Sequence, residues 1–151
     1  MRITFVTILI SLLPMVSIFS LSYFFPAGKQ EHTPVFQPPG WIFGVVWTVV
    51  SLVFGTVSAV AFDRLSDRTY IYLFYIGILT GLLAWLPLNS HKYYMTTFYL
   101  LVVLSYVSVG YIVYLSYQRV IECVVMLPLP FWLIFASCLN GANYDHHALE
   151  N

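Results

Sequence analysis

Charged residues are confined to a few short segments of this chain, and long hydrophobic stretches lie between them. Five stretches contain no aspartate, glutamate, lysine or arginine: Ile3–Gly28, His32–Phe62, Thr69–Ser90, Tyr93–Gln118 and Cys123–Tyr144. A bilayer core about 30 Å thick needs roughly 20 helical residues, and each stretch supplies them. Because backbone polar groups in lipid must be satisfied within the segment, each stretch is expected to be a helix. The pattern predicts an all-α integral membrane protein, a bundle of five transmembrane helices near residues 3–25, 41–62, 70–88, 95–117 and 122–143.

The composition predicts the same class of protein. The chain is 60% hydrophobic and 8% charged, with a formal net charge of zero, whereas a soluble domain carries about 25% charged residues. The lipid bilayer is therefore the expected environment of a multi-pass protein, with residues 1–151 forming one membrane domain. The few basic residues are scattered along the chain, which argues against binding to nucleic acid.

The N-terminal stretch and the basic residues predict how the chain enters the membrane. The stretch is longer than a signal-peptide h-region of about 7–15 residues and has no clear cleavage site, so we expect it to be retained as a helix. One side of the membrane receives Arg2, Arg64, Arg68 and Arg119, and the other receives Lys29 and Lys92. The larger number of basic residues on the first side predicts that the N terminus lies inside and the C terminus outside. The sequence does not distinguish a bacterial inner membrane from an organelle membrane.

The segment FQPPGWIFGVVWT (Phe36–Thr48) begins the second predicted helix. Two prolines stiffen its approach, so that the helix can begin at Gly40 or Trp41 without losing an internal donor. Small residues then fall beneath Trp41 within an arc of about 80°, with Trp47 on the flank; they are Gly44, Thr48, Ser51, Gly55 and Ala59. Such a stripe is typical of a helix-packing seam below an interfacial tryptophan. Two indoles beside a glycine can also wall a flat aromatic ligand.

The fifth predicted helix carries amides on the same side as an indole. Trp132, Ala136, Leu139 and Asn143 fall within about 80° of one another, and Asn140 lies about 60° from the Trp132 direction. Amides in a membrane helix face protein or water, so these either bond to another helix or contact a ligand. In the third helix, Gly77-x-x-x-Gly81 is a site for close packing against a helix of this chain or of a second copy in a homodimer.

Candidate chemistry beyond binding is sparse. No carboxylate falls within a predicted span, and the chain has no nucleophile motif, P-loop or dinucleotide fingerprint, so no catalytic residue is assigned. The histidines (His32, His91, His146 and His147) come from three separate segments without the spacing of metal ligands. We interpret them as solvated loop residues and predict no metal site.

Three blocks of sequence resemble the TspO/MBR family, the translocator or tryptophan-rich sensory proteins. The family's helix-2 signature is approximately W-x-P-P-x-W-x-F-G-P-V-W-T, and the chain matches it at Pro38, Pro39, Trp41, Phe43, Gly44, Val46, Trp47 and Thr48, with Phe36 and Val45 as departures. The segment PLPFWLIFASCLN resembles the start of the fifth helix, at Pro128, Trp132, Phe135, Ala136, Leu139 and Asn140. The segment YIGILTGLLAWLPL resembles the third helix, at Tyr75, Gly77, Leu79, Ala84, Trp85 and Pro87.

The resemblance implies a membrane protein that binds, and transports or senses, porphyrin or haem-type tetrapyrroles or similar apolar ligands. No cofactor is required, and porphyrin or haem is expected as ligand. The residues expected to line the pocket are Trp41, Phe43, Gly44, Trp47, Trp85, Trp132, Ala136, Leu139 and Asn140. Two alternatives stay open: an enzyme-like protein that photo-oxidises porphyrin, and a scaffold without a dedicated ligand. The chain departs from the family at Leu82, Leu83, Asn89 and Ser90, and after Asn140.

Overall fold

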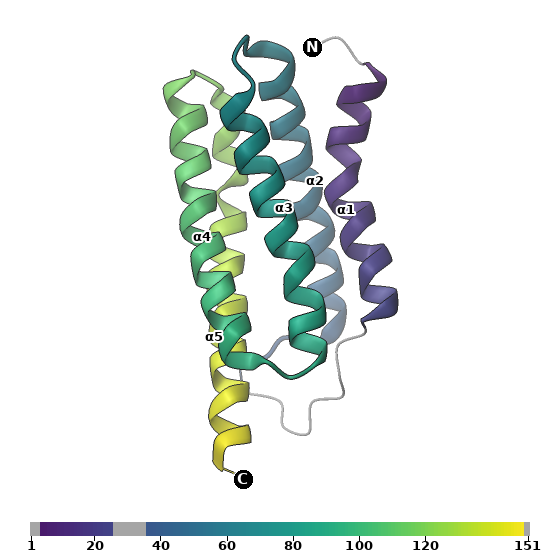
Figure 1. Cartoon of the computed structure of the whole chain (residues 1–151), viewed down its shortest axis with the longest axis vertical. Coiled ribbons are helices and arrows are strands. Elements are labelled where there is room, and N and C mark those ends of the chain that lie inside the picture. The colour runs from purple at the N-terminus through teal and green to yellow at the C-terminus, as the bar shows by residue number, and fades with distance from the viewer. Residues whose placement is uncertain (1–3, 26–35, 150–151) are drawn as a thin grey trace.

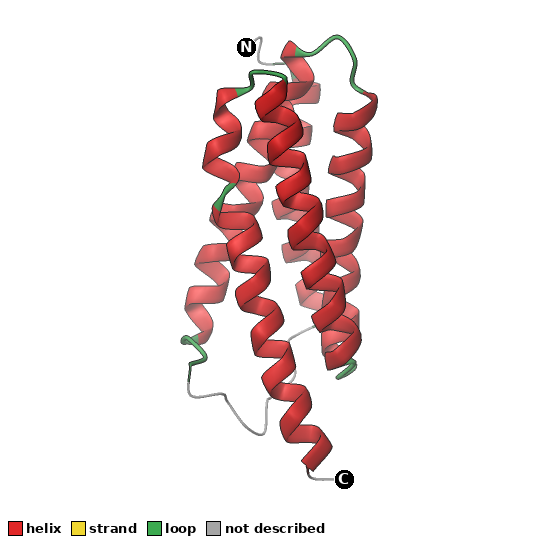
Figure 2. Cartoon of the chain, turned by 90° about the vertical axis from the view of Figure 1, so that its left-hand side faces the viewer, coloured by secondary structure: helices red, strands yellow, loops and turns green. Residues whose placement is uncertain are grey.

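The described part of the chain forms five long helices that run side by side in alternating directions along one axis (Figures 1 and 2). The computed structural model describes residues 4–25 and 36–149, with side chains of the last helix described as far as residue 143. The elements are α1 (Phe5–Phe24), α2 (Gly40–Arg64), α3 (Thr69–Ser90), α4 (Tyr94–Tyr117), the short 3-10 helix η1 (Ile121–Met126) and α5 (Pro128–Leu149). Within these described ranges, five segments are long and apolar enough to cross a membrane. The predicted five-helix, all-α membrane bundle is confirmed.

The first four helices begin and end within two residues of their predicted bounds, and the fifth predicted span, near residues 122–143, corresponds to the membrane-length segment Ile121–Asn143. Its first residues form η1, and the α-helix starts only at Pro128. Pro128 has no N–H to donate, so it is well suited to the first turn of an α-helix, where that N–H would have no intrahelical partner, and α5 starts there. The α-helix also continues past its predicted end at residue 143.

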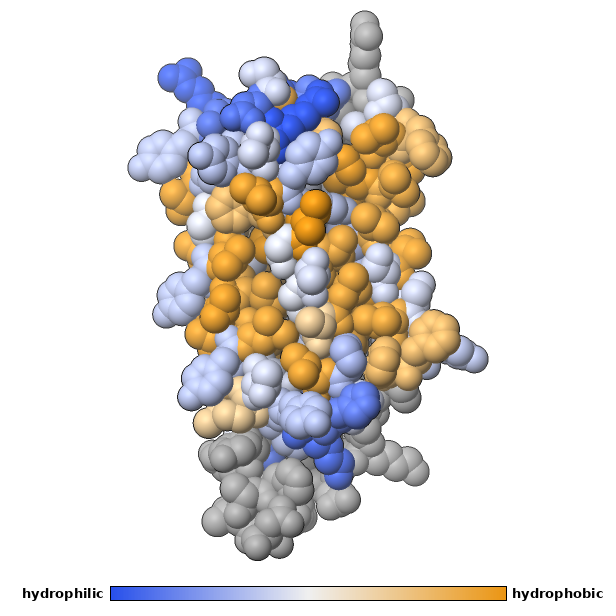
Figure 3. Space-filling view, in the orientation of Figure 1, coloured by the Kyte–Doolittle hydropathy of each residue, from blue (hydrophilic) through white to orange (hydrophobic). Residues whose placement is uncertain are grey.

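The helices form a ring in the order α1, α2, α5, α4, α3, as their contacts indicate. The most extensive contacts join α1 to α2 and α4 to α5, whereas α2 and α5 touch only sparsely. The centre of the bundle is filled by fully buried side chains, among them Phe54, Ile78, Leu101, Tyr111 and Leu133. An apolar outer belt separates two polar ends (Figure 3). This surface is suited to lipid, and it supports a multi-pass integral membrane protein.

Close packing of α1, α2 and α3 depends on a proline and a glycine. Pro14 lies inside α1 and cannot donate to the carbonyl of Ile10, four residues earlier. The hydroxyl of Tyr75 in α3 donates to that carbonyl at 2.8 Å. In α2, a Cβ added to Gly55 would overlap the backbone of Ser11 in α1. The predicted packing seam is therefore present at Gly55, where the two backbones touch.

The two glycines of the third helix have different surroundings. A Cβ at Gly81 would overlap the side chain of Leu104 in α4, so this glycine allows α3 and α4 to approach closely. Gly77 is exposed, and a Cβ there would meet nothing within 4 Å. The use of this motif between two copies of the chain stays a prediction.

Charged groups gather at the end where α2 meets α3 and α4 meets η1, at the top of Figures 1 and 3. Arg64 at the end of α2 donates two hydrogen bonds, of 2.8 and 2.6 Å, to the carboxylate of Glu122 in η1. The Arg68 guanidinium lies 4.9 Å from the ring centre of Phe62. Asp67 accepts a hydrogen bond from the backbone N–H of Thr69, and this bond lowers the pKa of the carboxyl. Which side of the membrane this end faces stays a prediction.

After two helices, a residue other than glycine adopts the left-handed backbone conformation that favours glycine. Lys92 after α3 and Arg119 after α4 have φ of 62° and 59°. The N–H of Arg119 donates to Ser116, and that of Val120 to Leu115, which is the Schellman pattern of a helix end. The turn after α3 follows the same pattern, and it leads directly into α4.

Candidate functional site

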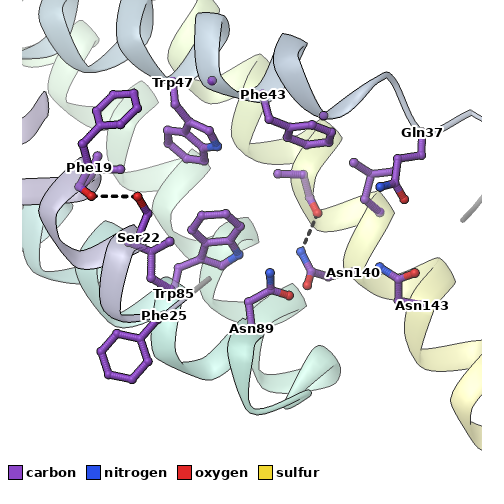
Figure 4. A pocket seen from close by; sticks show the side chains of 16 residues that line it. Phe19, Ser22, Phe25, Gln37, Phe43, Trp47, Trp85, Asn89, Asn140 and Asn143 are labelled. Carbon is purple, nitrogen blue, oxygen red and sulfur yellow. Dashed lines mark hydrogen bonds between the residues drawn. The ribbon is translucent and has the colours of Figure 1, made fainter. Parts of the chain in front are cut away.

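A cavity of about 410 Å³ opens between α1, α2, α3 and α5, at the end of the bundle opposite the arginines (Figure 4). Its size falls in the range of about 300–1,000 Å³ that is usual for small-molecule sites. It lies where α2 and α5 have few contacts with each other. The described residues that line it are Ile18, Phe19, Ser22 and Phe25 from α1 and its end, Gln37, Gly40, Phe43, Gly44 and Trp47 from α2 and its approach, Trp85, Leu86 and Asn89 from α3, and Ala136, Leu139, Asn140 and Asn143 from α5.

Two indoles form the aromatic wall of the cavity. The rings of Trp47 in α2 and Trp85 in α3 lie 5.2 Å apart between centroids and are inclined by 32°, close to a stacked arrangement. Phe43, one helical turn before Trp47, extends the same wall (Figure 4). Flat aromatic faces of this kind bind other flat rings through offset stacking and a large apolar contact area.

Trp132 supports this wall from behind. It does not line the cavity; its ring lies 5.4 Å from Phe43 and 6.2 Å from Trp47 between centroids, edge to face in both pairs. Phe135, at 5.3 Å, completes the contact on the side of α5. Trp132 therefore holds the positions of the two α2 side chains that face the cavity.

Glycines keep the α2 side of the cavity open. A Cβ at Gly44 or Gly40 would meet nothing within 4 Å, in contrast to Gly55 in the same helix. The sequence left two interpretations of the small-residue stripe open, a packing seam and a ligand notch. Gly55 forms the packing seam against α1, and Gly44 lies where a ligand notch would be.

The polar atoms at the cavity are not fully paired within the described part of the chain. Asn140 is 5% exposed, and its side-chain Nδ2 donates to the carbonyl of Ala136 at 2.8 Å (Figure 4). Its Oδ1, the Nε1 of Trp85 and the Oε1 of Gln37 are buried without a partner among the described residues. A buried polar atom left unpaired costs about 1–3 kcal/mol, so a ligand that pairs with these atoms gains affinity.

The electrostatic character of the cavity is neutral. The lining side chains among the described residues are apolar, aromatic, hydroxyl or amide, and none of them is charged. A charged group inserted deep into the cavity, beside the indoles, would therefore lose its hydration without gaining a counter-charge. The cavity is suited to an uncharged, flat and largely apolar group.

The structure brings most of the predicted site residues together. Seven of the nine line the cavity: Phe43, Gly44, Trp47, Trp85, Ala136, Leu139 and Asn140. Trp41 does not; it is 70% exposed on the outside of the bundle. Asn140 was expected either to bond another helix or to contact a ligand, and its amide N–H instead bonds within α5 while its oxygen lies at the cavity.

Sequence reasoning missed the contribution of α1 and of several amides. Ile18, Phe19 and Ser22 look like ordinary residues of a membrane helix, and nothing in the sequence marks them as lining residues. Asn89 was noted only as a departure from the family pattern. Asn89 lies just past the predicted end of the third helix at residue 88, but within the uncharged stretch Thr69–Ser90. Its place in that stretch was a usable signal, because amides in membrane helices face protein or a cavity.

The histidines give no metal site in the part of the chain that is described. The Nδ1 of His91 lies 2.7 Å from the carbonyl oxygen of Pro87, and its ring is exposed. His32 lies outside the described residues, and so do the side chains of His146 and His147. Within the described ranges, no group of three or more His, Cys, Asp or Glu side chains could hold a metal ion.

A comparison with protein families agrees with the motifs and the five-helix fold. The model of the TspO/MBR family matches residues 4–144, which is nearly the whole chain. No curated protein matches the chain.

Proposed function

The chain belongs to the TspO/MBR family, and we propose that it binds a porphyrin or haem-type tetrapyrrole, or a similar flat apolar ring, in the cavity walled by Trp47 and Trp85. The observation that carries this proposal is the near-stacked indole pair at a ring distance of 5.2 Å, which borders an open cavity. Trp47 is only 6% exposed and packs against Trp85, yet both indoles border the cavity. A flat ligand in the cavity can add its apolar contact area to the part of each ring that lines it.

The neutral lining supports a ligand whose body is apolar. A tetrapyrrole ring inserted beside Phe43 and Trp47 leaves its acidic substituents free to extend toward the end of the bundle, where Gln37 and Asn143 lie. Amides there can donate to carboxylates without placing a charge beside the indoles. The described lining residues include no histidine, cysteine or methionine, so we expect binding to depend on the ring and not on an iron ligand.

The experiment is a titration of the purified protein with protoporphyrin, followed by tryptophan fluorescence in detergent. We expect saturable quenching with one site per chain, weakened by Trp47→Phe and unchanged by Trp41→Phe, which alters an exposed ring outside the cavity. Quenching that rises with the amount of porphyrin per micelle and never saturates would contradict a dedicated site. Loss of the porphyrin absorption band in light but not in darkness would identify degradation, the enzyme-like alternative.

A further inference from the structure

The outer face of α4 carries tyrosines along the whole length of the helix. Six exposed residues, which we call the α4 stripe, follow one another at alternating intervals of four and three: Tyr99, Val103, Tyr106, Gly110, Val113 and Tyr117. This is the spacing of the a and d positions in a pair of coiled helices. In Figure 3, pale-blue side chains interrupt the orange belt on the side where Figure 1 shows α4. α4 supplies none of the described residues that line the cavity, so the stripe is separate from the proposed ligand site.

Tyr106 lies at the middle of α4, a depth at which a tyrosine is costly on a surface that faces lipid. The helix runs from Tyr94 to Tyr117, so at roughly 1.5 Å per residue Tyr106 is about 17 Å from either end. This depth is close to the centre of a bilayer core about 30 Å thick. Tyr106 is 75% exposed, and its hydroxyl has no hydrogen-bond partner among the described residues. Lipid tails offer none either, so the hydroxyl carries the full cost of leaving water unpaired.

The tyrosines that point into the bundle are paired. The hydroxyl of Tyr111 donates to Ser58 Oγ at 3.1 Å, and that of Tyr75 donates to the Ile10 carbonyl at 2.8 Å. Tyr99 and Tyr117 of the stripe lie nearer the ends of α4, where tyrosines commonly contact the membrane interface. Tyr106 has neither solution, so its hydroxyl needs a partner from outside the chain.

We propose that the α4 stripe is the surface on which two copies of this chain pair in the membrane, with the two Tyr106 hydroxyls bonded to each other. Two copies that insert in the same orientation are related by a two-fold axis along the membrane normal, so their α4 helices run parallel and each stripe residue meets its counterpart. A hydroxyl both donates and accepts, so two tyrosines at the same depth satisfy each other. A second copy provides this partner by symmetry, whereas an unrelated helix needs a polar residue at the matching depth.

Gly110 allows the two helices to approach closely. It lies one helical turn after Tyr106, and a Cβ added to it would meet only the edge of the Phe74 ring, at 3.8 Å. The space over this glycine is therefore not filled by the described part of its own chain. Small residues at such positions let helix backbones come together in lipid, where van der Waals contact and interhelical hydrogen bonds drive association.

The first test is disulfide cross-linking of the full chain in phosphatidylcholine vesicles. The background is Cys138→Ala, which removes the exposed cysteine and leaves the buried Cys123. Val103→Cys on the stripe should link two copies, and Ile76→Cys on α3 should not; both side chains are 56% exposed, so access to the oxidant is matched. Linking at position 76 alone, no linking at either position, or equal linking at both, the result of random collisions, would overturn the proposal.

The second test isolates the hydroxyl. The dissociation constant of the pair is measured in vesicles by energy transfer between donor-labelled and acceptor-labelled copies at increasing dilution in lipid. Tyr106→Phe removes only the hydroxyl and should weaken pairing by about fivefold, the effect of one interhelical hydrogen bond. Tyr99→Phe is the control, because headgroups and water can pair a hydroxyl near the helix end, and it should have little effect. An unchanged dissociation constant in Tyr106→Phe would overturn the pairing of the hydroxyls.

Two exposed glycines provide the third test. Gly110→Leu places a side chain on the stripe and should abolish pairing, because it meets the second copy. Gly77→Leu makes the same change on α3, where a Cβ meets nothing within 4 Å, and should keep pairing. Circular dichroism shows whether each variant is folded, and the cross-linking and Tyr106→Phe results decide the proposal if Gly110→Leu is not. Pairing that survives in folded Gly110→Leu, or that is lost in folded Gly77→Leu, would overturn the assignment to α4.

Discussion

The hydroxyl of Tyr75 donates to the carbonyl of Ile10, which is the one carbonyl in α1 that Pro14 leaves without its usual helical donor. The bond, at 2.8 Å, joins α3 to α1 across a part of the protein where lipid offers no alternative donor. Tyr75 also stacks on Phe54 of α2, with ring centroids 5.2 Å apart. The Tyr75 side chain thus donates to the carbonyl that Pro14 leaves unpaired, and it contacts both α1 and α2. Together with α3, these are the helices that supply most of the cavity wall.

A double-mutant cycle tests this relationship. Tyr75→Phe removes the hydroxyl and should lower the free energy of unfolding in detergent by about 1 kcal/mol, because the Ile10 carbonyl is left unpaired. In a Pro14→Ala background the new N–H at position 14 can donate to that carbonyl, so the same change should cost clearly less. An equal cost in both backgrounds would show that the hydroxyl has no special relation to the proline.

Two glycines of α2 provide a matched pair for the packing seam. Gly55→Ala places a methyl group against the backbone of Ser11, and backbone cannot move aside as a flexible side chain can. We expect a loss of about 1–3 kcal/mol in the free energy of unfolding. Gly44→Ala makes the same chemical change where a Cβ meets nothing within 4 Å, so it should leave stability unchanged or slightly raised. Similar losses in both variants would contradict a seam confined to the Gly55 region.

The aromatic wall predicts two effects that can be measured separately. Trp47→Phe reduces the stacking area against a bound ring and should weaken porphyrin affinity by about fivefold, or roughly 1 kcal/mol.

Trp47 and Trp132 touch edge to face, at 6.2 Å between centroids, with no ligand between them. Their Phe variants should therefore couple in the free energy of unfolding of the ligand-free protein, by about 0.5–1.5 kcal/mol. Strict additivity without ligand would mean that Trp132 does not support the wall.

The sequence was sufficient to predict the fold because the constraint of the membrane is strong. Uncharged stretches of about 20 residues have one structural solution in lipid, so helix number and most helix bounds followed from the positions of the charges. The break before Pro128 was also within reach, since a proline marks the start of a helix more readily than its interior. What the sequence could not predict was how the helices pack against one another.

The cavity was only partly predictable, for reasons of geometry. Trp132 and Ala136 share a face of α5, yet Ala136 lines the cavity and Trp132 lies behind it. Which of them reaches the cavity depends on how α5 is inclined against α2, and a helical wheel contains no such information. The contribution of Phe19 from α1 depends in the same way on where Gly55 lets two helices touch.

The end of α4 allows a prediction in which two opposing effects can be compared. Arg119 has a φ of 59°, a left-handed conformation that costs a residue with a Cβ about 1–2 kcal/mol. Arg119→Gly removes that strain but gives the unfolded chain more freedom, which costs about 0.4–1 kcal/mol. The relief is the larger effect, so we expect the variant to be more stable by about 0.5 kcal/mol in chemical unfolding. Arg119→Ala is the matched control: it removes the same charge but keeps the Cβ, and it should give no gain. If both variants change stability equally, the charge of Arg119 matters and its backbone conformation does not.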